Sequence, residues 1–304
     1  MKRYFNVFLF VSLLFLLLSL YRAEYLKIPH IQSYRRLILS MVLLCCGFLL
    51  ESVCWRKTLR FHGAAVSLRS GIVSTGLSIF GKYIPGKVWL IMGRSGSIAK
   101  LEGLEEKKAL YSSFVSQLLS LWTGLMTGIV CLFSITVPSH LIGLMLLLYV
   151  LLTLFLFVRP VHFFLLKLPA SILKKKVTLP ILQQGVVIRL VPVFLCRWVV
   201  ISLSFYFLVT ALTDHPFPLV AGFAFPFAGT IGLAAVFAPG GIGIREGVMT
   251  VLLLSAGFPV TLSTTISVTS RLWYLAGEFF IFTVALVLRG GVSGRRKKTV
   301  QGNS

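Results

Sequence analysis

Two short segments place proline, glycine and basic residues inside an otherwise apolar chain: GKYIPGKVWLIMGR at 81–94 and APGGIGIREG at 238–247. A helix that begins after a Pro-Gly pair exposes unpaired N–H groups and the positive end of its dipole, and both favour an anion. Lysine and arginine side chains nearby would add to that attraction. The two segments therefore predict a site for a phosphate group, with the candidate residues Lys82, Pro85, Gly86, Lys87, Arg94, Pro239, Gly240, Gly241, Gly243, Arg245 and Glu246. The alternative is that proline and glycine only form tight turns and that Lys82 and Arg94 lie at the membrane interface.

The last apolar segment contains two further candidates, Arg271 and Glu278. Their spacing of seven residues puts them on one face of a helix but ~10 Å apart along its axis. Each is therefore expected to pair elsewhere, Arg271 with Glu246 and Glu278 with Arg245. Ionisable groups inside membrane segments are costly and indicate function, although a purely structural ion pair explains these two residues equally well.

Residues for acid–base catalysis are scarce. Asp214 is the only aspartate among eight acidic residues, and the sequence contains no serine-hydrolase, zinc-protease or phosphate-loop motif. The five cysteines lack the spacing of a zinc site. We therefore expect no catalytic residue, no metal, no cofactor and no enzymatic activity.

The composition sets the fold class. With 57% hydrophobic and only 12% charged residues, the chain departs strongly from soluble proteins, of which about a quarter is charged. Its apolar runs are long enough to cross the ~30 Å hydrocarbon layer, so the net charge of +22 is interpreted as topological signal and not as a nucleic-acid-binding surface. The prediction is an all-α polytopic membrane protein whose crossings lie at 4–21, 37–55, 109–134, 141–158, 186–211 and 262–288.

Some ionisable residues near the ends of these runs are assigned to the lipid headgroups. Glu51, close to Arg56 and Lys57, is placed at a helix end, and Arg189 and Arg197 are placed where the fifth crossing opens. The N-terminal segment lacks a small-residue cleavage site, so it is predicted to be a retained helix and not a signal peptide.

Two regions, 64–99 and 218–257, do not fit plain crossings because proline and glycine divide each into arms that are too short. They are predicted to be re-entrant helical hairpins, entering from opposite faces of the membrane. With basic clusters taken as cytoplasmic, both termini are cytoplasmic, although eight full crossings would give the same parity. The single membrane domain (1–304) then divides into a first repeat half (1–140), an inverted second half (141–290) and a basic, disordered tail (291–304). Gly/Pro-interrupted segments at matching positions of two halves are typical of a transporter's central site.

The stretches APGGIGIREGVM (238–249), KYIPGKVW (82–89) and SRLWYLAGE (270–278) resemble the lysylphosphatidylglycerol synthase/flippase transmembrane-region family. The resemblance implies that the glycine-rich loop ending at Arg245 and Glu246 is the family signature and that Arg271 accompanies it. It also implies translocation of lipids between leaflets. Synthase members add a soluble aminoacyl-transferase domain after the membrane region, where this sequence has a short basic tail, so lysyl transfer is not expected.

The function expected from these observations is a flippase-like carrier, in a bacterial-type inner membrane, for an anionic phospholipid or a polyprenyl-phosphate-linked sugar. The alternatives are a membrane transferase, with Glu246 as base, and an accessory protein of envelope glycan or glycolipid biosynthesis. Expected partners are the lipid, the bilayer, and envelope-biosynthesis proteins or a second copy of the chain. Nucleic acid is not an expected partner.

Overall fold

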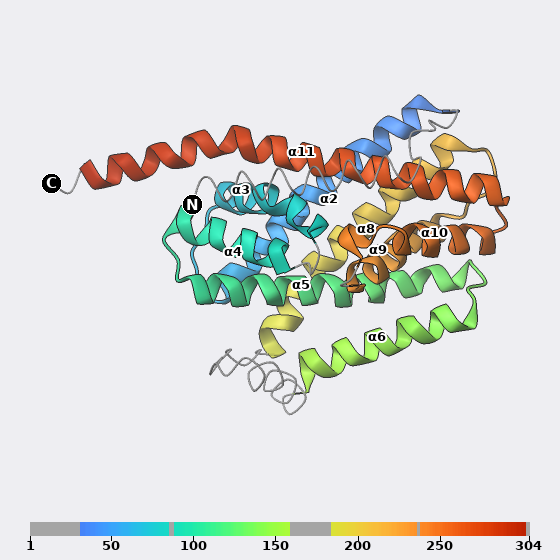
Figure 1. Ribbon diagram of the computed structural model, residues 1–304, viewed down its shortest axis with the longest axis horizontal. Helices are drawn as coiled ribbons and strands as arrows, with labels where there is room; N and C mark the ends of the chain where they lie inside the picture. The colour runs from blue at the N-terminus through green and yellow to red at the C-terminus, as the bar shows by residue number, and fades with distance from the viewer. Residues whose placement is uncertain (1–30, 85–87, 159–183, 236–237, 302–304) are drawn as a thin grey trace.

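A computed structural model describes residues 31–84, 88–158, 184–235 and 238–301, and in these ranges the chain is helical without strands (Figure 1). Within these ranges, five helical segments are long and apolar enough to cross a membrane: α2 (Tyr34–Phe61), α5 (Glu106–Gly128) with its continuation η2 (Ile129–Phe133), α6 (Ser139–Phe157), α8 (Gln184–Leu212), and α11 (Val260–Gln301) as far as Gly290. They correspond to five of the six predicted crossings. The sixth, 4–21, lies outside the described residues, as do the candidates Pro85, Gly86 and Lys87.

The two irregular regions each contain a pair of short helices. The first region comprises α3 (Leu68–Ser78), η1 (Ile79–Tyr83) and α4 (Val88–Glu102), and α3 packs against α4. The second comprises η3 (Leu219–Phe223), α9 (Ala224–Ala234), η4 (Pro239–Gly241) and α10 (Ile244–Ser255), and α9 packs against α10. No arm of either hairpin reaches the ~20 residues that a crossing needs. We call these two units the first and second hairpin.

Side-chain caps and glycine turns start the short helices. The hydroxyl of Ser67 accepts a hydrogen bond from the backbone N–H of Ser70 and so caps the N-terminus of α3. At the start of α10 the Glu246 carboxylate accepts the N–H of Gly243 over 2.7 Å. Gly243 and the preceding Gly240 and Gly241 have φ between 59° and 83°, a left-handed conformation that favours glycine.

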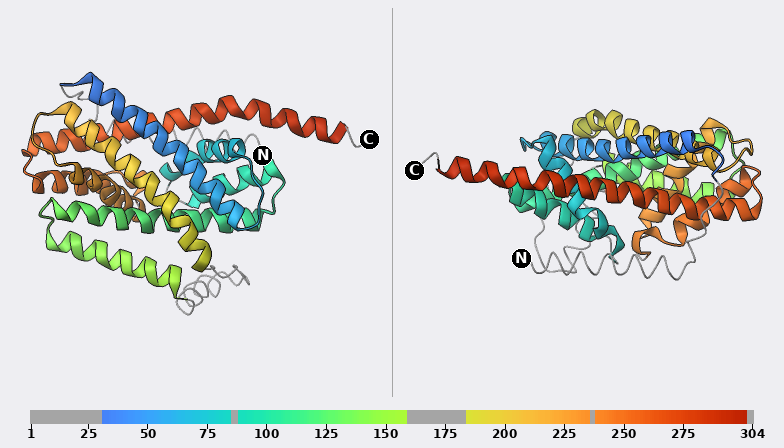
Figure 2. Two further views of the ribbon diagram at one scale, coloured as in Figure 1. Left: turned by 180° about the vertical axis from the view of Figure 1, so that it is seen from behind. Right: turned by 90° about the horizontal axis from the view of Figure 1, so that it is seen from above.

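Helix α2 from the first half of the sequence and helix α8 from the second half run side by side (Figure 2). Small residues and hydroxyls let them approach closely, as in many membrane helix pairs. Ser40 and Ser204 each donate to the other's backbone carbonyl, over 2.7 and 2.5 Å, and Gly47 lies against Ile201.

The tips of the two hairpins meet in the interior, where η1 contacts η4. A Cβ on Gly240 would lie 2.5 Å from Cε1 of the buried Tyr83 ring, so the absence of a side chain permits this approach. The Arg271 guanidinium donates to the Gly240 carbonyl over 3.2 Å and fixes the tip of the second hairpin to α11. The backbone of α11 is helical as far as Gln301.

Candidate functional site

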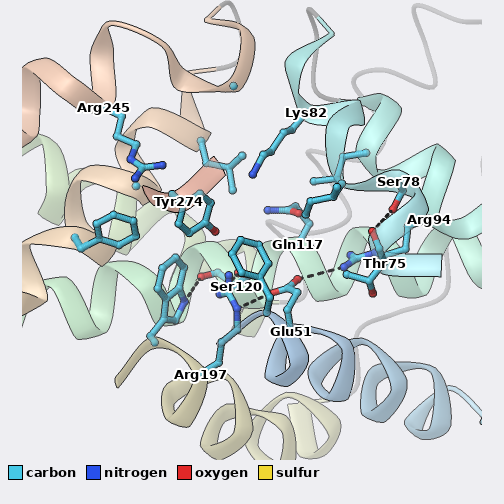
Figure 3. Close-up of a pocket in the computed structure, with 18 of the residues that line it drawn as sticks. Glu51, Thr75, Ser78, Lys82, Arg94, Gln117, Ser120, Arg197, Arg245 and Tyr274 are labelled. Atoms are coloured by element: carbon cyan, nitrogen blue, oxygen red, sulfur yellow. Dashed lines mark hydrogen bonds and ion pairs between the residues drawn. The ribbon is translucent and has the colours of Figure 1, made fainter. Parts of the chain in front are cut away.

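A cavity of about 90 Å³ lies between the hairpins and the long helices (Figure 3). Its volume is several times what one water molecule requires. In the part of the chain that the structure describes, five cationic side chains line it: Lys82, Arg94, Arg197, Arg245 and Arg271. We call this space the cationic cavity. Hydroxyl and amide groups of Thr75, Ser78, Gln117 and Ser120 complete its polar wall.

The cations come from both hairpins and from two long helices. Lys82 lies in η1 and Arg94 in α4 of the first hairpin, and Arg245 lies in α10 of the second. Arg197 and Arg271 project from α8 and α11. The four arginines are between 2% and 6% exposed. The side chains of Lys82 and Arg94 both form ion pairs with carboxylates of neighbouring helices.

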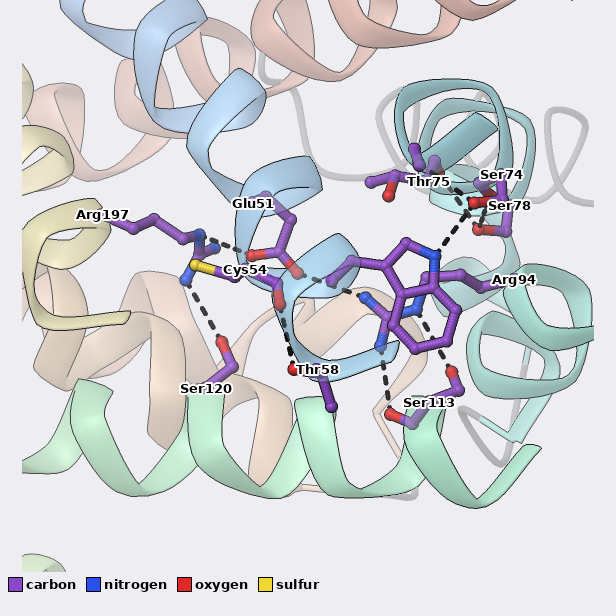
Figure 4. Close-up of polar contacts among 12 residues, drawn as sticks. Glu51, Cys54, Thr58, Ser74, Thr75, Ser78, Arg94, Ser113, Ser120 and Arg197 are labelled. Carbon is purple, nitrogen blue, oxygen red and sulfur yellow. Dashed lines mark hydrogen bonds and ion pairs between the residues drawn. The ribbon is translucent and has the colours of Figure 1, made fainter. Parts of the chain in front are cut away.

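One carboxylate serves two of the arginines (Figure 4). Glu51 of α2 pairs with the Arg197 Nε over 2.5 Å and with the Arg94 Nη1 over 3.4 Å. Arg94 also donates from Nε to the Ser113 hydroxyl and from Nη2 to the Ser113 carbonyl, and its guanidinium stacks 4.5 Å from the centre of the Trp55 ring. Arg197 donates to the Ser120 hydroxyl over 3.2 Å.

This arrangement corrects the sequence interpretation that Glu51 lies at a helix end and that Arg197 lies at the start of a crossing. Glu51 lies inside α2 because that helix continues to Phe61, six residues beyond the predicted crossing. The extension is buried: Trp55 and Leu59 pack with Ile98 and Ala99 of α4. Arg197 lies near the middle of α8, whereas Arg189, one turn from its start, is exposed as expected.

At the hairpin tips, the pairing of Glu278 differs from the prediction. Lys82 pairs with Glu278 over 2.5 Å, and the Tyr83 hydroxyl donates to the same carboxylate over 2.7 Å. The expected pair of Glu278 with Arg245 is therefore wrong, because Lys82 from η1 occupies that position. The expected pair of Arg271 with Glu246 is confirmed, at 4.0 Å.

Aromatic rings also contact three of the cationic side chains. Lys82 and Arg245 lie 4.9 and 4.8 Å from the centre of the Tyr274 ring, and Arg271 lies 5.0 Å from that of Tyr83. Such contacts stabilise a cation without neutralising it. They leave the charge of the guanidinium groups available to a ligand.

At the helix start of the second hairpin, the Glu246 carboxylate accepts the N–H of Gly243, so this N–H is not available to a ligand. The cationic side chains that line the cavity attract an anion in its place. Gly240 and Arg245 line the cavity, whereas Gly241 packs against the backbone of Gly232, in contact with α9.

Several residues at the cavity were not among the sequence candidates: Glu51, Thr75, Gln117, Ser120, Arg197 and Tyr274. Glu51 and Arg197 carried a usable signal, since both are ionisable residues within or next to apolar runs. The hydroxyl, amide and aromatic residues carried none, because such residues occur throughout membrane helices.

Comparison with known proteins agrees with the resemblance seen in the sequence. A family model described as the lysylphosphatidylglycerol synthase TM region matches residues 5–281. Comparison with curated proteins and with solved structures gave no match. The matched range covers most of the 304 residues. The chain is a multi-pass membrane protein and belongs to the lysylphosphatidylglycerol synthase transmembrane-region family.

Proposed function

We propose that the protein is a flippase-like carrier that moves an anionic lipid between membrane leaflets. The lipid is an anionic phospholipid or a polyprenyl-phosphate-linked sugar. The observation that supports this most is the convergence of five cationic side chains on one interior cavity. Buried charge of one sign is unfavourable unless an opposite charge accompanies it, and a lipid phosphate is the anion that a surrounding bilayer supplies.

The arrangement of the hairpins supports a transport role. Each is too short to cross the membrane, and their tips meet beside the cavity, as expected for re-entrant hairpins of two inverted halves. In transporters with inverted repeats, broken helices surround a central site and one half rocks against the other. In this proposal the cations bind the headgroup phosphate, while rocking of the halves exposes the cavity to each leaflet in turn. The bacterial-type inner membrane and cytoplasmic termini are part of the same proposal.

The geometry favours a carrier over a membrane transferase. An enzyme would need a general base, and Glu246 is the sequence candidate for it. The Glu246 carboxylate accepts the N–H of Gly243 and pairs with Arg271, so it already acts as a helix cap and counter-ion. An accessory protein without a lipid site would tolerate the loss of Arg245, whereas a carrier would not. The carrier and the accessory protein therefore predict different outcomes for an Arg245 variant.

Reconstitution in liposomes tests the proposal. Vesicles would contain acyl-labelled phospholipids or polyprenyl phosphates, and a membrane-impermeant reagent would quench label in the outer leaflet. We expect the wild-type protein to expose inner-leaflet label faster than empty vesicles, in the absence or presence of an imposed proton gradient. Arg245→Gln should reduce that rate at least tenfold, while Arg189→Gln, an exposed arginine on α8, should leave it unchanged. Exchange no faster than in empty vesicles for every lipid and gradient would contradict the carrier.

A further inference from the structure

The cationic cavity contains more positive charge than its carboxylates balance. Among the described residues, five cations line it, and three carboxylates pair with them: Glu51, Glu246 and Glu278. Five positive charges against three negative charges leave an excess of two. Lys82 is balanced by Glu278 and Arg271 by Glu246, so the excess lies elsewhere.

One excess charge belongs to the group formed by Glu51, Arg94 and Arg197. The single carboxylate lies closest to Arg197, at 2.5 Å, and its distance to Arg94 is 3.4 Å. The remaining hydrogen bonds of Arg94 go to the neutral Ser113. Arg94 is thus a well-positioned arginine whose charge is only partly compensated.

The other excess charge belongs to Arg245. It forms no ion pair with a described carboxylate, and its guanidinium is held between Phe225 and Tyr274 at 4.5 and 4.8 Å from the ring centres. The side chain is 6% exposed, yet its buried Nη2 has no hydrogen-bond partner in the described part of the chain. A buried, unpaired donor is costly, and this one lines the cavity.

The two incompletely balanced arginines come from different hairpins, Arg94 from α4 and Arg245 from α10. They lie on opposite sides of the cavity, with Lys82 and Gln117 between them (Figure 3). A ligand with two negative charges would restore neutrality in a cavity that residues of both hairpins line.

We infer that the cavity selects a lipid whose phosphate is terminal and doubly charged, a phosphomonoester, over a phosphodiester with a single charge. This inference rests on the proposed function in one respect, namely that the ligand is a lipid. A phosphomonoester carries about 1.5 to 2 negative charges at pH 7, because its second pKa is about 6. The same chemistry is found on a diacylglycerol phosphate and on an isoprenoid phosphate.

Equilibrium binding to the purified full-length protein in detergent tests this preference. The probes are dioctanoyl phosphatidic acid, a monoester, dioctanoyl phosphatidylglycerol, a diester with the same chains, and farnesyl phosphate, an isoprenoid monoester. At pH 8 we expect both monoesters to bind at least tenfold more tightly than the diester. If only one monoester binds more tightly than the diester, that result shows whether the ligand carries diacylglycerol or isoprenoid chains, and it upholds the charge preference. Equal or tighter binding of the diester would overturn the inference.

Variants locate the preference. Arg245→Gln and Arg94→Gln each remove one excess charge, so each should weaken monoester binding at least tenfold and diester binding much less. Arg245→Lys keeps the charge and should retain the preference, which separates a charge effect from misfolding. The preference should also weaken at pH 5.5, where most of the monoester has lost its second charge. An undiminished preference in both glutamine variants, or an equal loss in Arg189→Gln, would refute the assignment. Selective binding without leaflet exchange would contradict the carrier and leave this inference intact.

Discussion

Replacing Glu51 by glutamine tests the interior location of the charge network. The substitution keeps the shape of the side chain and removes its charge, so that Arg94 and Arg197 both lose their ion pair with this carboxylate. These arginine side chains are 3% and 7% exposed, and Glu51 itself is 14% exposed. Neither arginine can turn to solvent without leaving its position in the helix bundle.

The expected cost follows from this burial. Removing one partner of a buried ion pair costs about 3–5 kcal/mol, because an uncompensated charge remains. Since Glu51 keeps some exposure, we expect the lower end, about 3 kcal/mol of unfolding free energy. If Glu51 lay among the headgroups, as its neighbours in sequence indicate, the loss would be about 0–1 kcal/mol.

Reversible unfolding in mixed micelles, followed by circular dichroism, measures this difference. Glu105→Gln is the matched control, because Glu105 is exposed. In a double-mutant cycle with Arg197→Gln, the double variant should cost less than the two single variants together, by about 1–3 kcal/mol. A loss below about 1 kcal/mol for Glu51→Gln, or strict additivity in the cycle, would refute the buried network.

Three further predictions concern packing and pH. Gly277→Ala would bring a Cβ within 2.7 Å of Phe48 Cδ2 and should destabilise the protein by about 1–3 kcal/mol. Gly143→Ala is the control, because its Cβ would meet no atom of another described residue within 4 Å, and it should be neutral or slightly stabilising. Equal unfolding midpoints of the two variants would contradict the close contact of α2 and α11. Gly240→Ala introduces a side chain at φ 59° against the Tyr83 ring and should lower leaflet exchange in the liposome assay; full activity would show that the hairpin tips need not touch. Burial, and secondarily the charge of Lys108, lower the pKa of His62 at the end of α2. Because the folded state favours the neutral ring, this contribution to stability is complete above about pH 6.5 and is lost as the pH falls below it. The melting temperature of His62→Asn should therefore fall less between pH 7.5 and 5 than that of the wild type. An identical dependence of the melting temperature on pH in both proteins would contradict this.

Much of the fold could be predicted because long apolar runs indicate crossings directly. Five predicted crossings coincide with five described helices, and the two regions broken by proline and glycine form paired short helices. These features depend on local composition alone. The proximity of Arg271 and Glu246 also followed, because two ionisable residues in adjacent apolar segments each need a partner.

The charge network could not be predicted because its partners come from distant helices. Arg197 was expected where the fifth crossing opens, and its partner Glu51 lies 146 positions earlier in the sequence. Lys82, and not Arg245 as was expected, pairs with Glu278, 196 positions away. Sequence spacing describes one helix face, whereas these pairs depend on how α2, α8, α11 and the hairpins pack together.

The most direct test of a phosphate site between the two hairpins is an experimental density map. The wild-type protein would be placed in nanodiscs that contain phosphatidic acid, with a bound antibody fragment to aid alignment by electron cryo-microscopy. We predict density for a phosphate group in the cationic cavity, within hydrogen-bonding distance of Arg245 and on the side facing Arg94. A map in which these two arginines line no common cavity, or in which the lipid phosphate binds only at the periphery of the protein, would contradict the account.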